Sequence, residues 1–429
     1  MLLLSVAAAA YSQNATVHPF IGKDQVNIDD SINLYKTLLS NTPIEPEFMY
    51  EPHFAIVGNK GKFFFSTGAR LRFTASFDWG NPVTKATGMG IGDLSPTLNG
   101  NEHLFQMSAG TSSLYFNIIG FPHTENQIGL FISLALDASD DNSYRIKAGQ
   151  VYMRYRDFQC GYATSLYSDR EADAFSIDGE GPCASGSQKR VQINWQHYFI
   201  PQLKVGLGVE LPKVAYTQAI ENWMTPEHIA SLQNSTYQRV PDIPLYVGYY
   251  GKNGHIRLTS VFRNIFYYDY TESKTENVFG YGLKLTGHAK IGPVTLYGMV
   301  QGGRSIASFM SGNSRVGLDL APSEGRESTA LIPTHSWGCI GAAQINFTPN
   351  VFMTATYGHL RNYTKKYLRM ATTEFDAQLR KGFTVSGNLI WRISNLFSTG
   401  IEYDYANRTS EDDTMVGNNR VYAMFMMNF

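Results

Sequence analysis

The most regular feature of the chain is a period of two in its hydrophobic positions. In "RLRFTASFDW" (70–79), apolar side chains alternate from Leu71 to Trp79, and Arg70 and Arg72 begin the polar set between them. Successive side chains of a strand point to opposite faces, so this pattern predicts a strand with one apolar and one polar face. The pattern recurs in "RVQINW" (190–195), "LKVGLGVEL" (203–211), "HIRLTSVFR" (255–263) and "FSTGIEYDY" (397–405).

Short and long connections alternate between the predicted strands. The short ones are "FIPQ" (199–202), "GKNG" (251–254), "KIGP" (290–293), "TPN" (348–350) and "ISN" (393–395). The long polar stretches lie near 80–105, 167–189, 212–242, 303–335, 362–383 and 409–419. With weaker gaps filled, about eight long loops and seven short turns predict about sixteen strands, an even number typical of bacterial outer-membrane barrels. The predicted fold class is all-β: a transmembrane antiparallel β-barrel with short periplasmic turns and long outer loops.

Aromatic clusters at strand ends support a position in the outer membrane, in contact with its lipid. They are Trp195 with Tyr198 and Phe199, Tyr249 with Tyr250, and Phe266 with Tyr267 and Tyr268. Amphipathic rings favour the headgroup interface. Composition agrees, because 26 Tyr, 26 Phe and 39 Gly among 429 residues favour strands and tight turns. The net charge of -1 gives no global field that would recruit nucleic acid.

The N-terminal region is predicted to precede the barrel. "MLLLSVAAAAYSQN" has the apolar run and small–x–small ending of a signal peptide, so residues 1–12 are predicted to be removed before Gln13. A buried N-terminal strand is the alternative. Residues 13–61 are predicted to be a periplasmic segment with a short helix at "DDSINLYKTLLSN" (29–41), and residues 62–429 the barrel. A second helix is expected at "TPEHIASLQ" (225–233), inside a long loop.

The sequence predicts no catalytic, metal or cofactor site. "GMGIGD" (88–93) lacks a surrounding βαβ pattern and is expected to be a flexible outer loop. The ten histidines are scattered, and no GxSxG motif is present. Cys160, Cys183 and Cys339 are interpreted as small packed residues, with a Cys160–Cys183 disulfide as the alternative.

The candidate chemistry is the charge on the polar strand faces. The basic residues on the predicted inward faces are Arg70, Arg72, Arg145, Lys147, Arg190, Arg257 and Arg263. Guanidinium groups along a pore favour anions that shed water, so the pattern predicts an anion preference. The alternative is that these groups pair with acids inside the lumen.

The loop "SDREADAFSIDGEGPCASGSQ" (168–188) is predicted to fold inward and narrow the pore, as the third loop does in sixteen-stranded porins. It contains Asp173, Asp178 and Glu180. Carboxylates opposite a basic wall would create a transverse field across the constriction. The alternative is an ordinary exposed loop whose carboxylates lie in solvent.

From about residue 53 to 429 the chain resembles the DcaP-type trimeric outer-membrane porins, in the form found in Bacteroidetes. The segments that carry the resemblance are "HFAIVGNKGKFFFSTGARLRFTASFDWG", "FSIDGEGPCASGSQKRVQINW", "YGKNGHIRLTSVFR" and "GNLIWRISNLFSTGIEYDYANRT", followed by a last strand that ends in Phe429. Two features depart from the family. The loop has Gly179-Glu180-Gly181-Pro182 where an aromatic residue usually precedes Glu-Gly-Pro, and one short helix replaces a long N-terminal coiled coil.

The resemblance implies a sixteen-stranded homotrimer through which small hydrophilic solutes diffuse, preferably anions such as dicarboxylates. It also implies pore-lining charge at Arg70, Arg72, Arg145, Lys147 and Arg190, and at Asp178 and Glu180 of the loop. The expected function is a passive channel and not an enzyme. A phospholipase-like barrel enzyme with surface Ser and His residues, or a non-conducting structural or adhesive barrel, are the alternatives.

The last stretch, "NRVYAMFMMNF" (419–429), is predicted to be the strand that closes the barrel. Phe425, Met427 and Phe429 then face lipid, and this terminal pattern is the form that the barrel-assembly machinery recognises in this class. Met424 and Met426 face inward, where apolar groups need a cover. The apolar stripe of the 29–41 helix is the expected cover.

Overall fold

The computed structural model describes residues 54–58, 62–95, 102–121, 124, 126–138, 143–186, 188–215, 238–313, 319–322, 330–363 and 378–428. The predicted signal peptide (1–12), both predicted helices and Phe429 lie outside these residues. Within the described part of the chain, no helix has the length and apolarity needed to cross a bilayer.

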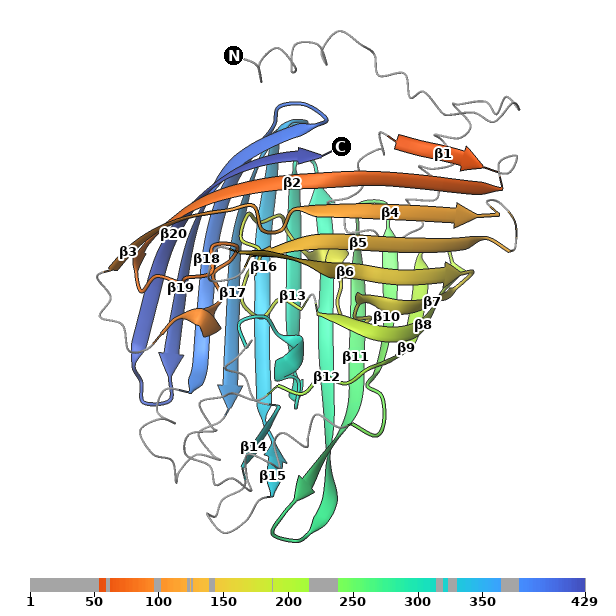
Figure 1. Ribbon diagram of the computed structural model, residues 1–429. Coiled ribbons are helices and arrows are strands. Elements are labelled where there is room, and N and C mark those ends of the chain that lie inside the picture. The colour runs from red at the N-terminus through yellow and green to blue at the C-terminus, as the bar shows by residue number, and fades with distance from the viewer. Residues whose placement is uncertain are drawn as a thin grey trace.

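Most of the described strands form one antiparallel sheet that closes on itself, and β14 (Leu320–Pro322) pairs separately with β15 (Leu331–Pro333) at the long-loop end (Figure 1). The closed sheet has eighteen described strands. Among these strands, β1 pairs only with β2 and lies in line with β20, and β3 and β4 together occupy one position beside β2. The eighteen strands therefore occupy sixteen positions around the barrel. Pairing of β2 with β20 closes the ring, so the predicted sixteen-stranded barrel is confirmed. The barrel strands are β2 (Phe63–Gly80), β3 (Glu102–Ser108), β4 (Ser113–Gly120), β5 (Ile128–Ala138), β6 (Tyr144–Tyr155), β7 (Phe158–Thr164), β8 (Lys189–Ile200), β9 (Leu203–Glu210), β10 (Ile243–Gly251), β11 (Gly254–Asp269), β12 (Lys274–Ile291), β13 (Val294–Arg304), β16 (His335–Thr348), β17 (Val351–Tyr363), β18 (Leu379–Arg392), β19 (Phe397–Ser410) and β20 (Met415–Asn428).

Strand β1 (Phe54–Gly58) was not predicted as a separate element. It pairs with β2 from Thr67 to Phe63, immediately beyond the point where β20 stops pairing at Arg70. Its backbone therefore continues the line of the closing strand along the same edge of β2. A strand in the segment assigned to residues 13–61 thus joins the sheet at the barrel seam.

In Figure 1 the tight turns lie along the upper and right-hand side of the barrel, and the long loops lie toward the lower left. Turns at 201–202, 252–253, 292–293, 349–350 and 393–396 confirm the predicted short connections. The predicted long loop at 409–419 is wrong, because β19 ends at Ser410 and β20 begins at Met415. Polar residues such as Asn418 resemble a loop in the sequence, because a strand face that points into the barrel can also be polar. In the structure, Asn418 is fully buried inside the barrel.

The two faces of the strands follow the predicted alternation. On β2, Arg72 and Asp78 are buried inside the barrel, whereas Phe73 and Phe77 are 53% and 44% exposed on its outside. Large apolar side chains are exposed in the same way on most barrel strands. An apolar exterior is stable only in contact with lipid, so the sheet is built to lie in a membrane.

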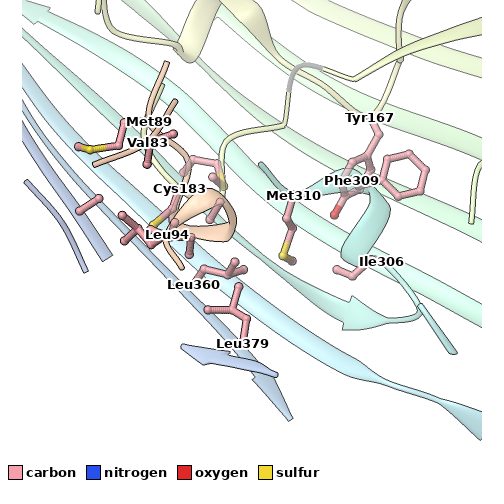
Figure 2. Packing of buried hydrophobic residues seen from close by; sticks show 14 of the residues in the cluster. Val83, Met89, Leu94, Tyr167, Cys183, Ile306, Phe309, Met310, Leu360 and Leu379 are labelled. Atoms are coloured by element: carbon pink, nitrogen blue, oxygen red, sulfur yellow. The ribbon is translucent and has the colours of Figure 1, made fainter. Parts of the chain in front are cut away.

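The lumen at the long-loop end is partly filled by loops. Two short 3₁₀ helices, η3 (Ile91–Asp93) and η6 (Ala307–Phe309), pack inside the barrel together with residues that follow β7 (Figure 2). The expectation of a flexible outer loop at 88–93 is wrong, because Ile91 is fully buried in this cluster. Gly312, at φ +85°, lies so close to Ile91 that a Cβ would approach its Cγ1 to 2.8 Å. The apolar members of this loop plug are Val83, Met89, Ile91, Leu94, Tyr167, Cys183, Ala184, Ile306, Phe309 and Met310.

The three cysteines are free thiols. Cys183 is buried in the loop plug, and Cys160 and Cys339 are half-buried on strands. The alternative of a Cys160–Cys183 disulfide is therefore wrong.

Candidate functional site

The third long loop (165–188) crosses the lumen and is held to the opposite wall by Glu402 of β19. The Glu402 carboxylate accepts hydrogen bonds from Ser176 Oγ and from the backbone N–H groups of Ile177 and Asp178, each at 2.7 Å. Asn388 Nδ2 donates a fourth bond at 2.8 Å and fixes the carboxylate on the wall. The predicted inward fold of this loop is confirmed.

Two further contacts fasten the same loop. Arg72 Nη2 donates to the carbonyl of Ile177, and the Cys183 N–H donates to Thr384 Oγ1 at 3.0 Å. Ile177 also lies in one buried apolar cluster with Met424 and Met426, the two inward methionines of the last strand, and Phe175 packs against this cluster. The third loop thus covers the apolar groups for which the 29–41 helix was the expected cover; that helix lies outside the described residues.

A cavity of about 250 Å³ lies between the first part of this loop and the barrel wall, on the side of the tight turns. Arg70 and Arg72, both predicted from the strand pattern, line it, as does Asp173 of the loop. Arg170 and Arg392 also line it and were not predicted. Asp173 contacts Arg170 at 3.5 Å and is the single carboxylate among the described lining residues. We call this space the lumen cavity; its remaining lining residues are Ala174, Phe175, Tyr297, Gln344, Phe352, Ile390, Ser398 and Met426.

Three other predicted arginines are buried against the inward-folded loops. Arg263 is fully buried and contacts Asp242 at 3.3 Å and Asp319 at 3.2 Å. The Arg190 guanidinium lies 4.7 Å from the ring centre of Phe309, on η6. Both side chains attach loops to the barrel wall. The contacts of Arg263 match the alternative given above, in which the inward basic groups pair with acids inside the barrel.

Arg257 also holds the third loop. It donates to the carbonyl of Leu166 and lies 3.7 Å from the ring centre of Tyr246. Beside it, Asp169 accepts hydrogen bonds from His255 Nε2 at 2.8 Å and from Thr286 Oγ1.

The remaining predicted basic residues, Arg145 and Lys147, lie at the long-loop end of β6 and are exposed. Lys147 forms an ion pair of 2.6 Å with Asp137, and both side chains are more than half exposed. A β-bulge at Ser133 and Leu134 explains why the alternation in this part of the chain was hard to read.

Comparisons with known proteins find no matching family model and no matching curated protein. Among solved structures, the outer-membrane channel DcaP of Acinetobacter baumannii superposes with a TM-score of 0.71 at 14% identity, over 86% of this chain and 99% of that chain. The anion-selective porin from Comamonas acidovorans gives 0.55 at 10% identity, over 86% and 100%. OmpF of Salmonella typhi, in complex with daunomycin, gives 0.53 at 7% identity, over 86% and 98%.

The fold is that of an outer-membrane porin. At these identities the likeness establishes the fold, and membership in the Bacteroidetes DcaP-type family is not shown by it. Together with the apolar exterior, the porin fold places the barrel in the bacterial outer membrane, with its tight turns toward the periplasm.

Two of the three acidic residues predicted to face the pore instead join the third loop of the porin barrel to the first long loop. Asp178 is buried, and its Oδ1 accepts hydrogen bonds from the backbone N–H groups of Met89 at 3.1 Å and Glu180 at 2.9 Å. Glu180 forms an ion pair with Lys85. Neither carboxylate lines the lumen cavity.

Burial, reinforced by the negative charge of Glu402, raises the pKa of Asp178 from its usual value of 3.8 to about 7. The docked loops therefore favour the protonated carboxyl, and this stabilisation is present below pH 3.8 and lost as the pH rises through about 7. We expect the melting temperature of the barrel to be higher at pH 5 than at pH 8. Asp178→Asn keeps the Oδ1 acceptor and should reduce this pH dependence, as circular dichroism melts in detergent would show. An unchanged pH dependence in that variant would contradict the assignment.

Sequence reasoning also missed the role of Arg420, on the closing strand. It lies directly opposite Asp78 of β2 and pairs with both carboxylate oxygens, with Nη2–Oδ2 at 2.7 Å. It also donates to the carbonyls of Val83 at 2.6 Å and Lys85 at 2.9 Å, in the first long loop. The alternation shows that Arg420 points inward, but no sequence signal identifies backbone carbonyls as its partners.

Proposed function

We propose that the protein is a passive outer-membrane channel for small hydrophilic solutes that favours anions, dicarboxylates among them. The observation that carries the proposal is the lumen cavity, which four arginines and one aspartate line. An anion that enters this space loses part of its hydration and gains interaction with the guanidinium groups, whereas a cation is repelled. The proposal includes no catalytic step.

The comparisons support this proposal at the level of fold. One structural neighbour is itself described as an anion-selective porin. By analogy with porin assemblies, we also propose that three copies associate through their barrel walls.

The ion preference is testable in planar bilayers with a salt gradient. A unit charge about 4 Å from an ion in water contributes about 1 kcal/mol, or roughly fivefold in permeability ratio. Replacing both Arg70 and Arg72 by glutamine removes two such charges, so it should lower the chloride-to-potassium permeability ratio by about 25-fold.

Lys147→Gln is the matched control, because Lys147 lies at the exposed loop end and is paired with Asp137. It should leave the reversal potential near that of the parent protein. A cation-selective parent, or an equal effect of the control, would overturn the proposed preference.

A second candidate, a non-conducting structural barrel, is favoured by the loop plug, which occupies part of the outer lumen with buried apolar side chains. The same recordings distinguish the two, because a blocked barrel gives no current steps in any salt.

A further inference from the structure

A row of cavity residues carries an arginine at each end. Cross-strand pairing places Arg72 opposite Met426, and Met426 opposite Ser398. Ser398 in turn lies opposite Arg392. These four residues therefore form one inward row across β2, β20, β19 and β18, near the periplasmic end of the barrel. All four line the lumen cavity.

The next inward row is apolar. Met424 lies opposite Gly400, which lies opposite Ile390, and Ile390 lies opposite Phe352. Positions two apart on a strand share a face and are separated by about 7 Å. The apolar row therefore lies about 7 Å from the arginine row, on the same inward face. Gly400 leaves room for its neighbour, since a Cβ there would lie 2.4 Å from Ile390 Cδ1.

Aromatic rings join the two rows. Phe175 of the third loop meets Phe352 of β17 edge to face, with ring centres 5.7 Å apart and an interplanar angle of 90°. The Arg392 guanidinium lies 5.1 Å from the ring centre of Phe352. The lumen cavity therefore has a basic side and an apolar, largely aromatic side within one small space.

We propose that the lumen cavity binds organic monoanions with an aromatic body, of the arene carboxylate class. The guanidinium forks suit a carboxylate, which they can hold through paired N–H···O bonds. The wall formed by Phe175, Phe352 and Ile390 suits a flat apolar ring, and it offers nothing to a small hydrated anion. An apolar cavity of about 150 Å³ suffices to bind benzene, so the space available here accommodates one ring with its charged group.

This inference rests on the proposed function, because the site lies on the path of the permeating anion. The probes are sodium benzoate and sodium acetate, added to single channels that carry chloride current. Benzoate should interrupt the current at about tenfold lower concentration than acetate, since one apolar group in a fitted pocket changes affinity by this order. Phe352→Leu should remove most of that difference. Arg392→Gln should weaken both anions.

Phe73→Leu is the matched control, because Phe73 is 53% exposed on the outside of β2. It should preserve the preference for benzoate. Should Phe352→Leu fail to assemble, Phe175→Ser on the loop tests the same wall. Equal potency of benzoate and acetate on the parent channel, or an unchanged preference in the wall variants, overturns the inference and leaves the proposed channel intact.

Calorimetric titration of the detergent-solubilised protein with benzoate tests the binding site independently of conduction, and so distinguishes the proposed site from the proposed channel function. Benzoate binding that Phe352→Leu weakens, in a barrel that conducts no chloride, would sustain the site and end the proposed function. No heat of binding in a conducting, anion-selective barrel would end the site alone.

Discussion

Replacing Arg420 by methionine should destabilise the barrel by about 3–5 kcal/mol, because it leaves the Asp78 carboxylate buried without its partner. The side chains of Arg420 and Asp78 are both fully buried. The same substitution also removes the donors to Val83 and Lys85, so the first long loop loses its attachment to the closing strand. The measurement is the free energy of unfolding from urea titration in detergent micelles.

The location of this pair makes the effect large. Asp78 and Arg420 are direct neighbours across β2 and β20, the two strands that close the ring. The seam joins the first and last strands of the barrel, so pairing there brings together residues far apart in the sequence. Loss of the pair should therefore weaken ring closure as well as loop docking.

Arg380→Met supplies the comparison. Arg380 pairs with Asp413, whose side chain is 71% exposed, and such a surface pair contributes only about 0–1 kcal/mol. The double variant Asp78→Leu with Arg420→Met should recover part of the loss, because no unpaired charge remains buried. Equal losses of unfolding free energy for Arg420→Met and Arg380→Met would show that the buried seam pair stabilises the barrel no more than a surface pair.

Replacing Glu402 by glutamine should release the third loop from the wall. The carboxylate accepts four hydrogen bonds from donors on the loop and on Asn388, and a glutamine amide would direct its own N–H groups toward some of them. Each hydrogen bond to a charged group contributes about 1.5–3 kcal/mol, so the loss of two is large for one loop. We expect higher single-channel conductance with added current noise, because the loop that crosses the lumen becomes mobile.

Glu276→Gln is a suitable control for the Glu402 experiment. Glu276 is paired at 2.8 Å with Lys274, a half-exposed residue at the outer end of the barrel. The single-channel conductance of Glu276→Gln should match that of the parent protein. Identical current traces for Glu402→Gln and the parent would mean that Thr384, Arg72 and the apolar contacts hold the loop without the carboxylate.

The sequence alone predicted the barrel and the direction of its side chains. In β2, the alternation of Arg72 with Phe73 is enough to show which side chain is inside, because a strand has a strict period of two. The alternation of short and long connections then determined the number of strands and their topology. These features are local, so they can be read from neighbouring residues.

Local patterns gave the wrong prediction where a run of glycines or of polar residues is compatible with two different structures. The glycine run at 88–93 predicts a flexible loop, yet glycine also permits close packing: a Cβ at Gly88 would lie 2.7 Å from Asp178 Oδ1, and Ile91 is buried in the loop plug. The polar residues near Asn418 predict a loop, but they belong to β20, because the inward face of a barrel strand is equally polar.

Tertiary structure decided what each inward charge does. Arg72 and Arg263 occupy equivalent positions in the strand pattern, yet Arg72 lines the lumen cavity and Arg263 is neutralised by Asp242 and Asp319. Period two gives the face of a residue and neither its depth nor its partner. The partners come from long loops, whose paths depend on contacts between residues far apart in the chain.

The methionines of the last strand show the same division. The sequence determined that Met424 and Met426 face inward and need an apolar cover. Only the folded chain showed that Phe175 and Ile177 provide it, from a loop about midway along the sequence. A strand pattern specifies that an apolar side chain must be buried, and the rest of the fold specifies what buries it.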